Sequence, residues 1–389
     1  MTDQLDDVAE VLHRPLYRND QYENPWDTWS WPWVSLAGFQ AGFKFFLGFG
    51  DESNVPKKAK ELDKTLPVLK PELTHFESSP TSGVRHMWIG HASSLVQFDG
   101  LTFLTDPIFS DRCSMVQFLG PKRYRPPPCT IDELPKIDCV FISHNHYDHL
   151  DYNSVVQLNK RFGDSLKWYV PQGMKSWMNA RDCQNVVELS WWEEHEHSPE
   201  SGFKMVATPC QHWSKRTATD TNKVLWASWC VLGPKHKFYF SGDTGYCAGF
   251  SQIGRKSFLK PQHADPEEAV MIHRDIKAEN SVGIHWGTFT LTLEFYLEPR
   301  TKLAEEAEKQ VFGGGVRPGH LSCRLNQQLS GGLGGFPRTS AVDSVLLASS
   351  LLSLSGNGGA ALQDMFYFLY ASSAKTSISV RYSRAMEVV

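Results

Sequence analysis

The sequence predicts an α/β protein in which two β-sheets pack face to face and helices cover them. Short apolar runs with strand character recur between residues 84 and 285 of the 389-residue chain. Two segments with helical features, residues 152–162 and 266–275, lie between those runs. Several of the strands end close to a histidine or an aspartate. Many strands with a few interposed helices are typical of a layered sandwich rather than a helical bundle.

Length, charge and cysteine content narrow the class of protein. A chain of this length buries a large core, as one big domain or two smaller ones. Its net charge of −4 gives no general attraction to nucleic acid or to anionic lipid. The eight cysteines form no Cys-x-x-Cys pair, which indicates reduced thiols inside the cell. Residues 1–7 are acidic and lack an apolar stretch, so we expect no secretion signal.

Changes in composition divide the chain into four predicted regions. Residues 1–25 are polar and we expect them to be disordered. Residues 26–83 open with nine tryptophans and phenylalanines and then a charged helix near 57–64. That aromatic stretch is either an arm packed on the core or an element that contacts a membrane surface. Residues 84–311 form the main domain, and residues 312–389, rich in Gly, Ser and Leu, a low-complexity tail.

The elements of the main domain are predicted in chain order. The runs at 84–90 and 101–104 read as neighbouring strands joined through Asp99 and Gly100. A buried strand at 138–143 precedes the first helix. Further strands are expected at 167–171, 182–189, 203–209, 225–232, 237–241 and 281–285. The second helix has Pro266 in its first turn and Asp265 as its cap.

The segment that carries the most chemical information directly follows the strand at 138–143. It holds His144, His146, Asp148 and His149 within six residues. The alternating histidines can point at one ion, and the Asp-His pair at a second ion beside it. Imidazole and carboxylate together suit Zn²⁺, although Mn²⁺ and Fe²⁺ also accept these ligands.

Three more ligands follow later strands. His212 comes after the strand at 203–209, Asp243 after that at 237–241, and His285 ends the strand at 281–285. Each alone is as consistent with packing as with function. Together with the first segment they make a set of seven ligands, in which Asp243, in a Gly-Asp-Thr-Gly turn, is the natural bridge between two metals.

This pattern resembles the His-x-His-x-Asp-His signature of the metallo-β-lactamase superfamily, which implies its αββα fold. Eight further segments resemble the family of N-acyl-phosphatidylethanolamine-hydrolysing phospholipases D, and the similarity extends from about residue 24 to 310. The segments are residues 24–26, 88–92, 103–110, 120–123, 143–154, 242–247, 265–269 and 284–289. The resemblance implies two Zn²⁺ ions. One would be held by His144, His146 and His212, the other by Asp148, His149 and His285, with Asp243 as the bridge.

The resemblance also implies an activity. A metal-bound hydroxide would hydrolyse N-acyl-phosphatidylethanolamine to an N-acylethanolamine and phosphatidic acid. Asp148, Asp243 and His263 would be catalytic, and Tyr147, Gln262 and His263 would contact the substrate. The expected partners are a phospholipid substrate, a membrane surface and a second copy of the chain, with no nucleic acid. The expected location is intracellular and peripheral, on the cytoplasmic face of internal membranes.

Two departures from the family oppose a simple transfer of that activity. A strand that the family carries after Asp243 is missing here, which would leave unpaired backbone groups between the strands of Asp243 and His285. The family's C-terminal part is replaced by the low-complexity tail. Three alternatives therefore stay open: a thioester or lactone hydrolase, a nucleic-acid phosphodiesterase that the charge disfavours, and an impaired isoform that keeps the metal site without turnover.

Overall fold

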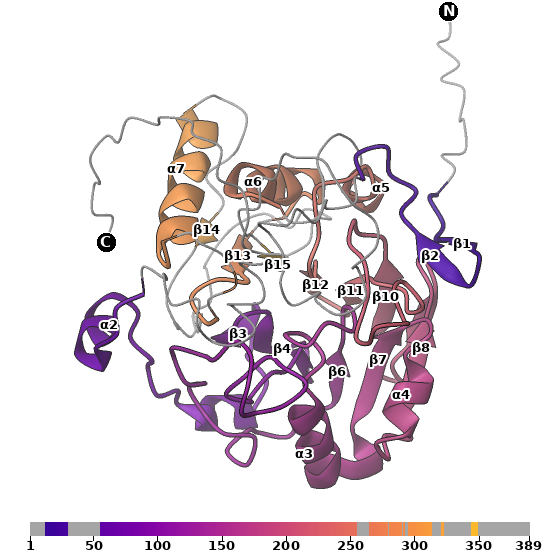
Figure 1. Ribbon diagram of the computed structural model, residues 1–389, viewed down its shortest axis with the longest axis horizontal. Helices are drawn as coiled ribbons and strands as arrows, with labels where there is room; N and C mark the ends of the chain where they lie inside the picture. The colour runs from indigo at the N-terminus through magenta and orange to yellow at the C-terminus, as the bar shows by residue number, and fades with distance from the viewer. Residues whose placement is uncertain are drawn as a thin grey trace, which may run out of the picture.

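The structure is a computed structural model, and it describes residues 12–29, 55–254, 264–278, 280–289, 291, 295–312, 320–322 and 344–348. Two β-sheets pack together, with helices on their outer sides (Figure 1). The predicted α/β sandwich is therefore confirmed. Within the described residues, no helix combines the length and the apolar character that crossing a membrane requires.

The first sheet has six strands whose spatial order follows the chain. They are β3 (Arg85–Gly90), β4 (Ser93–Phe98), β5 (Leu101–Thr105), β6 (Cys139–Phe141), β7 (Lys167–Pro171) and β8 (Val186–Leu189). Strands β3 to β5 form an antiparallel meander, and β5 to β8 run parallel. Asp99 and Gly100 do make a turn with positive φ, but it joins β4 to β5. The expected pairing of the 84–90 and 101–104 runs is wrong, because β4 lies between them.

Side chains that alternate along these strands enter two different cores. In β6 and β7, Val140, Trp168 and Val170 face the outer helices. Phe141 and Tyr169 face the second sheet, where their rings stack with centroids 5.0 Å apart. Both faces of these parallel strands are therefore apolar, as expected for strands covered on both sides.

The second sheet has seven strands, and its order departs from the chain. The order is β14 (His320–Ser322), β13 (Asn280–Ile284), β15 (Ser344–Ala348), β12 (Lys237–Phe240), β11 (Ser228–Leu232), β10 (Lys204–Thr208) and β9 (Glu194–Glu196). Strands β9 to β12 pair antiparallel, whereas β12, β15, β13 and β14 run parallel.

Helices cover both sheets on their outer sides (Figure 1). They are α3 (Tyr152–Phe162), α4 (Lys175–Asn179), α5 (Gly249–Gly254), α6 (Pro266–Asp275) and α7 (Glu298–Phe312). The helix α2 (Ala59–Thr65) lies at one side of the sandwich, and short 3₁₀ helices occur at Leu73–Glu77 and Gly163–Ser165. The predicted helix at 266–275 is confirmed as α6. Asp265 caps it by accepting the backbone N–H of Glu268, whose side chain accepts the N–H of Asp265 in return.

Strand β15 occupies the place of the strand that the sequence lacks. Its backbone pairs in parallel with β12 on one side and with β13 on the other, so it separates the strand that precedes Asp243 from the strand that precedes His285. The expected gap is filled from residues 312–389, which were expected to be a tail without specified structure. Residues 320–322 and 344–348 of this region are sheet strands. The physical reason is that the neighbours of a missing strand present unpaired N–H and C=O groups.

The N-terminal residues also differ from expectation. Residues 1–25 were expected to be disordered, but β1 (Leu16–Arg18) and β2 (Gln21–Glu23) form a hairpin. The next residues lie against the end of β10. Asn24 Nδ2 donates to the His212 carbonyl at 2.7 Å, and Trp26 Nε1 donates to the Cys210 carbonyl at 3.2 Å. Trp26 is buried, so the aromatic stretch begins as part of the core. Residues 30–54, which hold most of that stretch, lie outside the described residues.

The position of β15 leads to a first prediction. A proline at residue 346 removes a backbone donor from a central strand, so Leu346→Pro should lower the free energy of unfolding by about 3 kcal/mol. Hydrogen exchange with mass spectrometry should show lost protection in peptides from β12 and β13. Glu200→Pro, in an exposed turn, is the control and should leave the protection of these peptides unchanged. Equal protection in both variants would contradict the pairing of β15.

Candidate metal centre

The seven predicted ligands come together where strands of both sheets end. Four lie in the loop that follows β6, and the other three follow β10, β12 and β13. The backbone at this edge adopts uncommon conformations, with φ of 54° at His91, 32° at Asp106 and 66° at His285. Such left-handed conformations in residues other than glycine cluster at functional sites.

Three histidines form the first group. His144 Nε2 lies 2.7 Å from His146 Nδ1, which lies 3.3 Å from His212 Nε2. A tetrahedral site with metal–nitrogen distances of about 2.0 Å has edges of about 3.3 Å. His144 and His212 are buried, and His146 is half-buried. The three nitrogens are therefore spaced as ligands of a single ion.

The second group contains Asp148, His149 and His285. Asp148 Oδ2 lies 3.5 Å from the Nε2 atoms of both His149 and His285. Asp243 lies between the groups: its Oδ2 is 3.2 Å from His149 Nε2, 3.2 Å from His285 Nε2 and 3.8 Å from His212 Nε2. Its carboxylate therefore contacts both groups, which is the arrangement of a bridging ligand.

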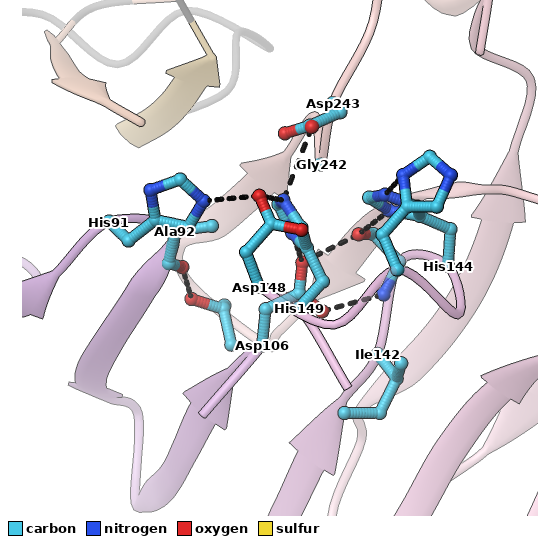
Figure 2. Close-up of polar contacts among 12 residues, drawn as sticks. His91, Ala92, Asp106, Ile142, His144, Asp148, His149, Gly242 and Asp243 are labelled. Carbon is cyan, nitrogen blue, oxygen red and sulfur yellow. Dashed lines mark hydrogen bonds and ion pairs between the residues drawn. The ribbon is translucent and has the colours of Figure 1, made fainter. Parts of the chain in front are cut away.

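Two residues outside the predicted set hold these ligands in place (Figure 2). Asp106, directly after β5, is fully buried and accepts from His149 Nδ1 at 2.6 Å. It also accepts the backbone N–H and the hydroxyl of Ser143. His91, directly after β3, places Nε2 2.9 Å from Asp148 Oδ2. A carboxylate on the far nitrogen of a histidine fixes its tautomer, so Asp106 turns His149 Nε2 towards the other ligands.

Electrostatics gives the ligands different protonation tendencies. Burial, reinforced by the neighbouring imidazoles, holds the pKa of His144 well below its usual range. Burial alone would raise the pKa of Asp243, but His149 and His285 outweigh it and hold that pKa well below its usual range. Burial opposes the charged form of His285, but Asp243 and Asp148 raise its pKa to about 9. Asp243 and Asp148 also raise the pKa of His149 well above its usual range, against the effect of burial, so without a cation His149 and His285 favour the protonated form.

The donor set fits divalent metal. Two candidate groups fit this description: the first is His144, His146 and His212, and the second is His91, Asp148, His149 and His285. Within each group, one ligand atom of every residue lies within 4.8 Å of those of the others. Imidazole nitrogens and carboxylate oxygens are ligands that divalent transition metals accept in proteins. His91 is also a member of the second group by distance, so it either supports Asp148 or stands close to the ion itself.

The remaining predicted site residues are Tyr147, Gln262 and His263. The Tyr147 hydroxyl donates to the Arg216 carbonyl at 2.8 Å, and the Arg216 guanidinium carbon lies 4.2 Å from the Tyr147 ring centroid. These contacts tie Tyr147 to the loop after His212, and its contact with substrate stays a prediction. Gln262 and His263 lie outside the described residues. The next residue, Ala264, donates its N–H to the carbonyl of Thr244, the neighbour of Asp243.

Sequence reasoning assigned no role to His91 or Asp106. A signal existed, because His91 directly follows the predicted strand at 84–90 and Asp106 lies two residues beyond the predicted strand at 101–104. What the sequence lacks is their distance from the loop, because β3 and β5 reach the site only through sheet pairing. A buried aspartate after a strand has to find hydrogen-bond donors, and that need was the available clue.

Comparisons with known proteins identify similar sequences and similar folds. Residues 102–286 match the beta-lactamase superfamily domain. The chain is 39% identical over 317 residues to N-acyl-phosphatidylethanolamine-hydrolyzing phospholipase D 1 of Caenorhabditis elegans, with 75% of this chain and 88% of the relative covered. It is 37% identical over 349 residues to the mitochondrial N-acyl-phosphatidylethanolamine-hydrolyzing phospholipase D of Saccharomyces cerevisiae, with 77% and 74% covered. A solved metallo hydrolase of Ignicoccus hospitalis matches with a TM-score of 0.47 at 19% identity, covering 64% of this chain and 98% of that one.

The fold and the site together thus define the class of protein: a metal-dependent hydrolase whose ligands form two groups. Within that class, the chain belongs to the N-acyl-phosphatidylethanolamine-hydrolysing phospholipase D family.

The hydrogen bond from His149 to Asp106 leads to a second prediction. In Asp106→Asn the amide can donate to His149 Nδ1 and stabilise the wrong tautomer, so affinity for the second metal should fall about 10- to 100-fold. Chelator competition with zinc measures this, and the first metal should stay bound. Asp132→Asn, on the exposed surface, is the matched control. Unchanged affinity for both metals would show that Asp106 does not orient His149.

The raised pKa of His285 leads to a third prediction. A metal requires the neutral imidazole, and below a pKa of about 9 His285 carries a proton in the metal-free protein. Metal affinity should therefore rise as pH increases from 6 to 9, with protons released on binding. Calorimetric titration in two buffers of different ionisation enthalpy measures that release. Affinity independent of pH over this range would contradict the assignment of His285 as a ligand.

Proposed function

We propose that this protein is a zinc-dependent phosphodiesterase that cleaves N-acyl-phosphatidylethanolamine to an N-acylethanolamine and phosphatidic acid. The observation that carries the proposal is the position of Asp243 between two ligand groups, which is the geometry of a two-metal site. Both curated relatives described above are named for hydrolysis of this lipid. Two metals about 4 Å apart lower the pKa of water between them and stabilise negative charge on a phosphodiester.

The chain's own residues supply order and charge at this site. Asp243, His149 and His285 are buried, Asp148 is half-buried, and the contacts among these four residues fix their positions. Asp106 and His91 restrain them from behind. A site in which ligands are held before substrate binds has little reorganisation left to make during the reaction. We propose that Asp148 and Asp243 are the essential carboxylates, and that His263, Gln262 and Tyr147 contact the substrate.

The proposal extends to the surroundings of the enzyme. We propose that the protein acts on a membrane surface, because its proposed substrate is a membrane lipid. We further propose that it is a homodimer located at the cytoplasmic face of internal membranes. The resemblance to the phospholipase D family supports this. Light scattering of the purified chain measures the oligomeric state, and flotation with vesicles measures membrane binding.

The impaired-isoform alternative is separated from catalysis by one measurement. Zinc content and release of N-acylethanolamine from mixed micelles are determined on the same purified chain. Two zinc ions with turnover support the proposal, and two zinc ions without turnover support the impaired isoform. Absence of zinc would overturn the site assignment itself. The presence of β15 in the second sheet favours the active protein, since the sheet between Asp243 and His285 is continuous.

Substitution of single ligands provides the fourth prediction. Asp148→Asn and His285→Ala should each abolish release of N-acylethanolamine, because both act on the second metal group. Asp164→Asn, at the 3₁₀ helix after α3, should retain full activity. Turnover close to that of the unaltered chain in either ligand variant would disprove the two-metal mechanism. Circular dichroism establishes that each variant is folded.

A further inference from the structure

We propose that the loop of residues 113–120 docks the protein on an anionic lipid bilayer by inserting Met115 and Phe118 beside the metal centre. The loop lies in the long connection between β5 and β6 and belongs to neither sheet. This inference rests on the proposed function, because it assumes that the substrate is reached from a bilayer. It assigns the contact to a region other than the aromatic stretch at residues 26–49.

The exposure of two large apolar side chains is the first observation. Phe118 is 81% exposed and Met115 is 69% exposed. The other exposed large apolar residues in the described part of the chain reach 55% at most. Two such side chains three residues apart form an apolar tip. An aromatic ring at the boundary between headgroups and acyl chains gains from burying its apolar body there.

The backbone beneath this tip is fixed by hydrogen bonds. The backbone N–H of Arg112 donates to Gln117 Oε1 at 3.1 Å, and Gln117 Nε2 donates back to the Arg112 carbonyl at 3.0 Å. Cys113 N donates to the Pro121 carbonyl at 3.2 Å. Gly120 has a φ of 101°, and a Cβ there would lie 2.6 Å from the Cβ of Ser114. The tip is therefore presented by an ordered frame, so little conformational entropy remains to be lost on docking.

Charge around the tip favours an anionic surface. Residues 112–125 contain four cations and no acidic residue, in a chain whose net charge is −4. Arg123 is buried and Arg125 pairs with Asp63, so the cations that flank the tip are Lys122 and the half-buried Arg112, whose guanidinium also donates to the Gly120 carbonyl. Lys122 is 3.6 Å from Asp111, but both side chains are more than half exposed. An exposed pair of this kind is weak and leaves Lys122 able to contact lipid phosphates.

The base of the loop connects the tip to the metal centre. Cys113 is fully buried in a small cluster with Ile108 and Phe289. The Phe289 ring packs edge-to-face on His91, with centroids 5.4 Å apart. His91 in turn contacts Asp148. One layer of packed side chains thus separates the docking loop from a metal ligand, so that docking would bring the bilayer close to the site.

The test uses the full chain with the double substitution Met115→Gln and Phe118→Ser. Flotation with vesicles of phosphatidylcholine and phosphatidylglycerol, which contain no substrate lipid, measures binding. We expect binding to weaken about tenfold for each side chain removed. Tyr17→Ser removes an exposed aromatic side chain from the β1–β2 hairpin, and binding should then match the unaltered chain. Equal vesicle binding by the double variant and the unaltered chain would overturn the proposal.

A second variant reports insertion directly. The tryptophan fluorescence of the Phe118→Trp variant should shift to shorter wavelength on these vesicles, and brominated lipids should quench it. Quenching no greater than in the unaltered chain would overturn the proposed insertion. Vesicles of phosphatidylcholine alone should bind more weakly, and equal binding would overturn the anionic preference. Because the vesicles lack substrate, docking through Phe118 can succeed even if hydrolysis of N-acyl-phosphatidylethanolamine fails. Conversely, the double variant should keep its turnover on a soluble short-chain substrate.

Discussion

The contact of the Asp243 carboxylate with His149, His212 and His285 is the interaction on which the rest of the structure depends. Asp243 is 3% exposed and His149 is fully buried. A buried carboxylate without partners costs several kcal/mol, and so does a buried imidazolium. Placed together they offset one another in part, and divalent cations are the partners that satisfy all of them at once. The site therefore concentrates charged groups, and the fold has to keep them at fixed distances from one another.

That requirement explains why the ligands lie at the ends of strands. A strand buried on both faces is among the least mobile parts of a protein, and a residue just beyond its end inherits that position. Asp106 follows β5 and the histidine loop follows β6, and these two strands pair in parallel. Asp243 and His285 follow β12 and β13 in the other sheet. The metal centre is thus assembled across the interface between the sheets, and the aromatic core below it sets the distance between them.

Much of this arrangement could be predicted from the sequence, because local signals specify it. The ligand loop at 144–149 lies within six residues, and the capping box at Asp265 lies within four. What could not be predicted depends on pairing between distant segments. Nothing near His91 says that its ring meets Asp148, 57 residues later. Strand β15 shows the same limit: residues 344–348 carry no alternating pattern that identifies their neighbours, and only the vacancy between β12 and β13 selects them.

The two ligand groups consequently depend on the second sheet to different degrees. His144 and His146 come from the loop after β6, and His212 follows β10, where Asn24 and Trp26 brace the backbone. None of these three needs β15. His285 follows β13, which pairs with β12 only through β15, so the separation of His285 from Asp243 is set by the inserted strand. A change in the pairing of β15 would therefore move the second group relative to the bridge while leaving the first group intact. The histidine motif can therefore persist in a chain that binds only one metal. For this reason the motif alone is a weaker indicator of catalysis than a continuous sheet between Asp243 and His285.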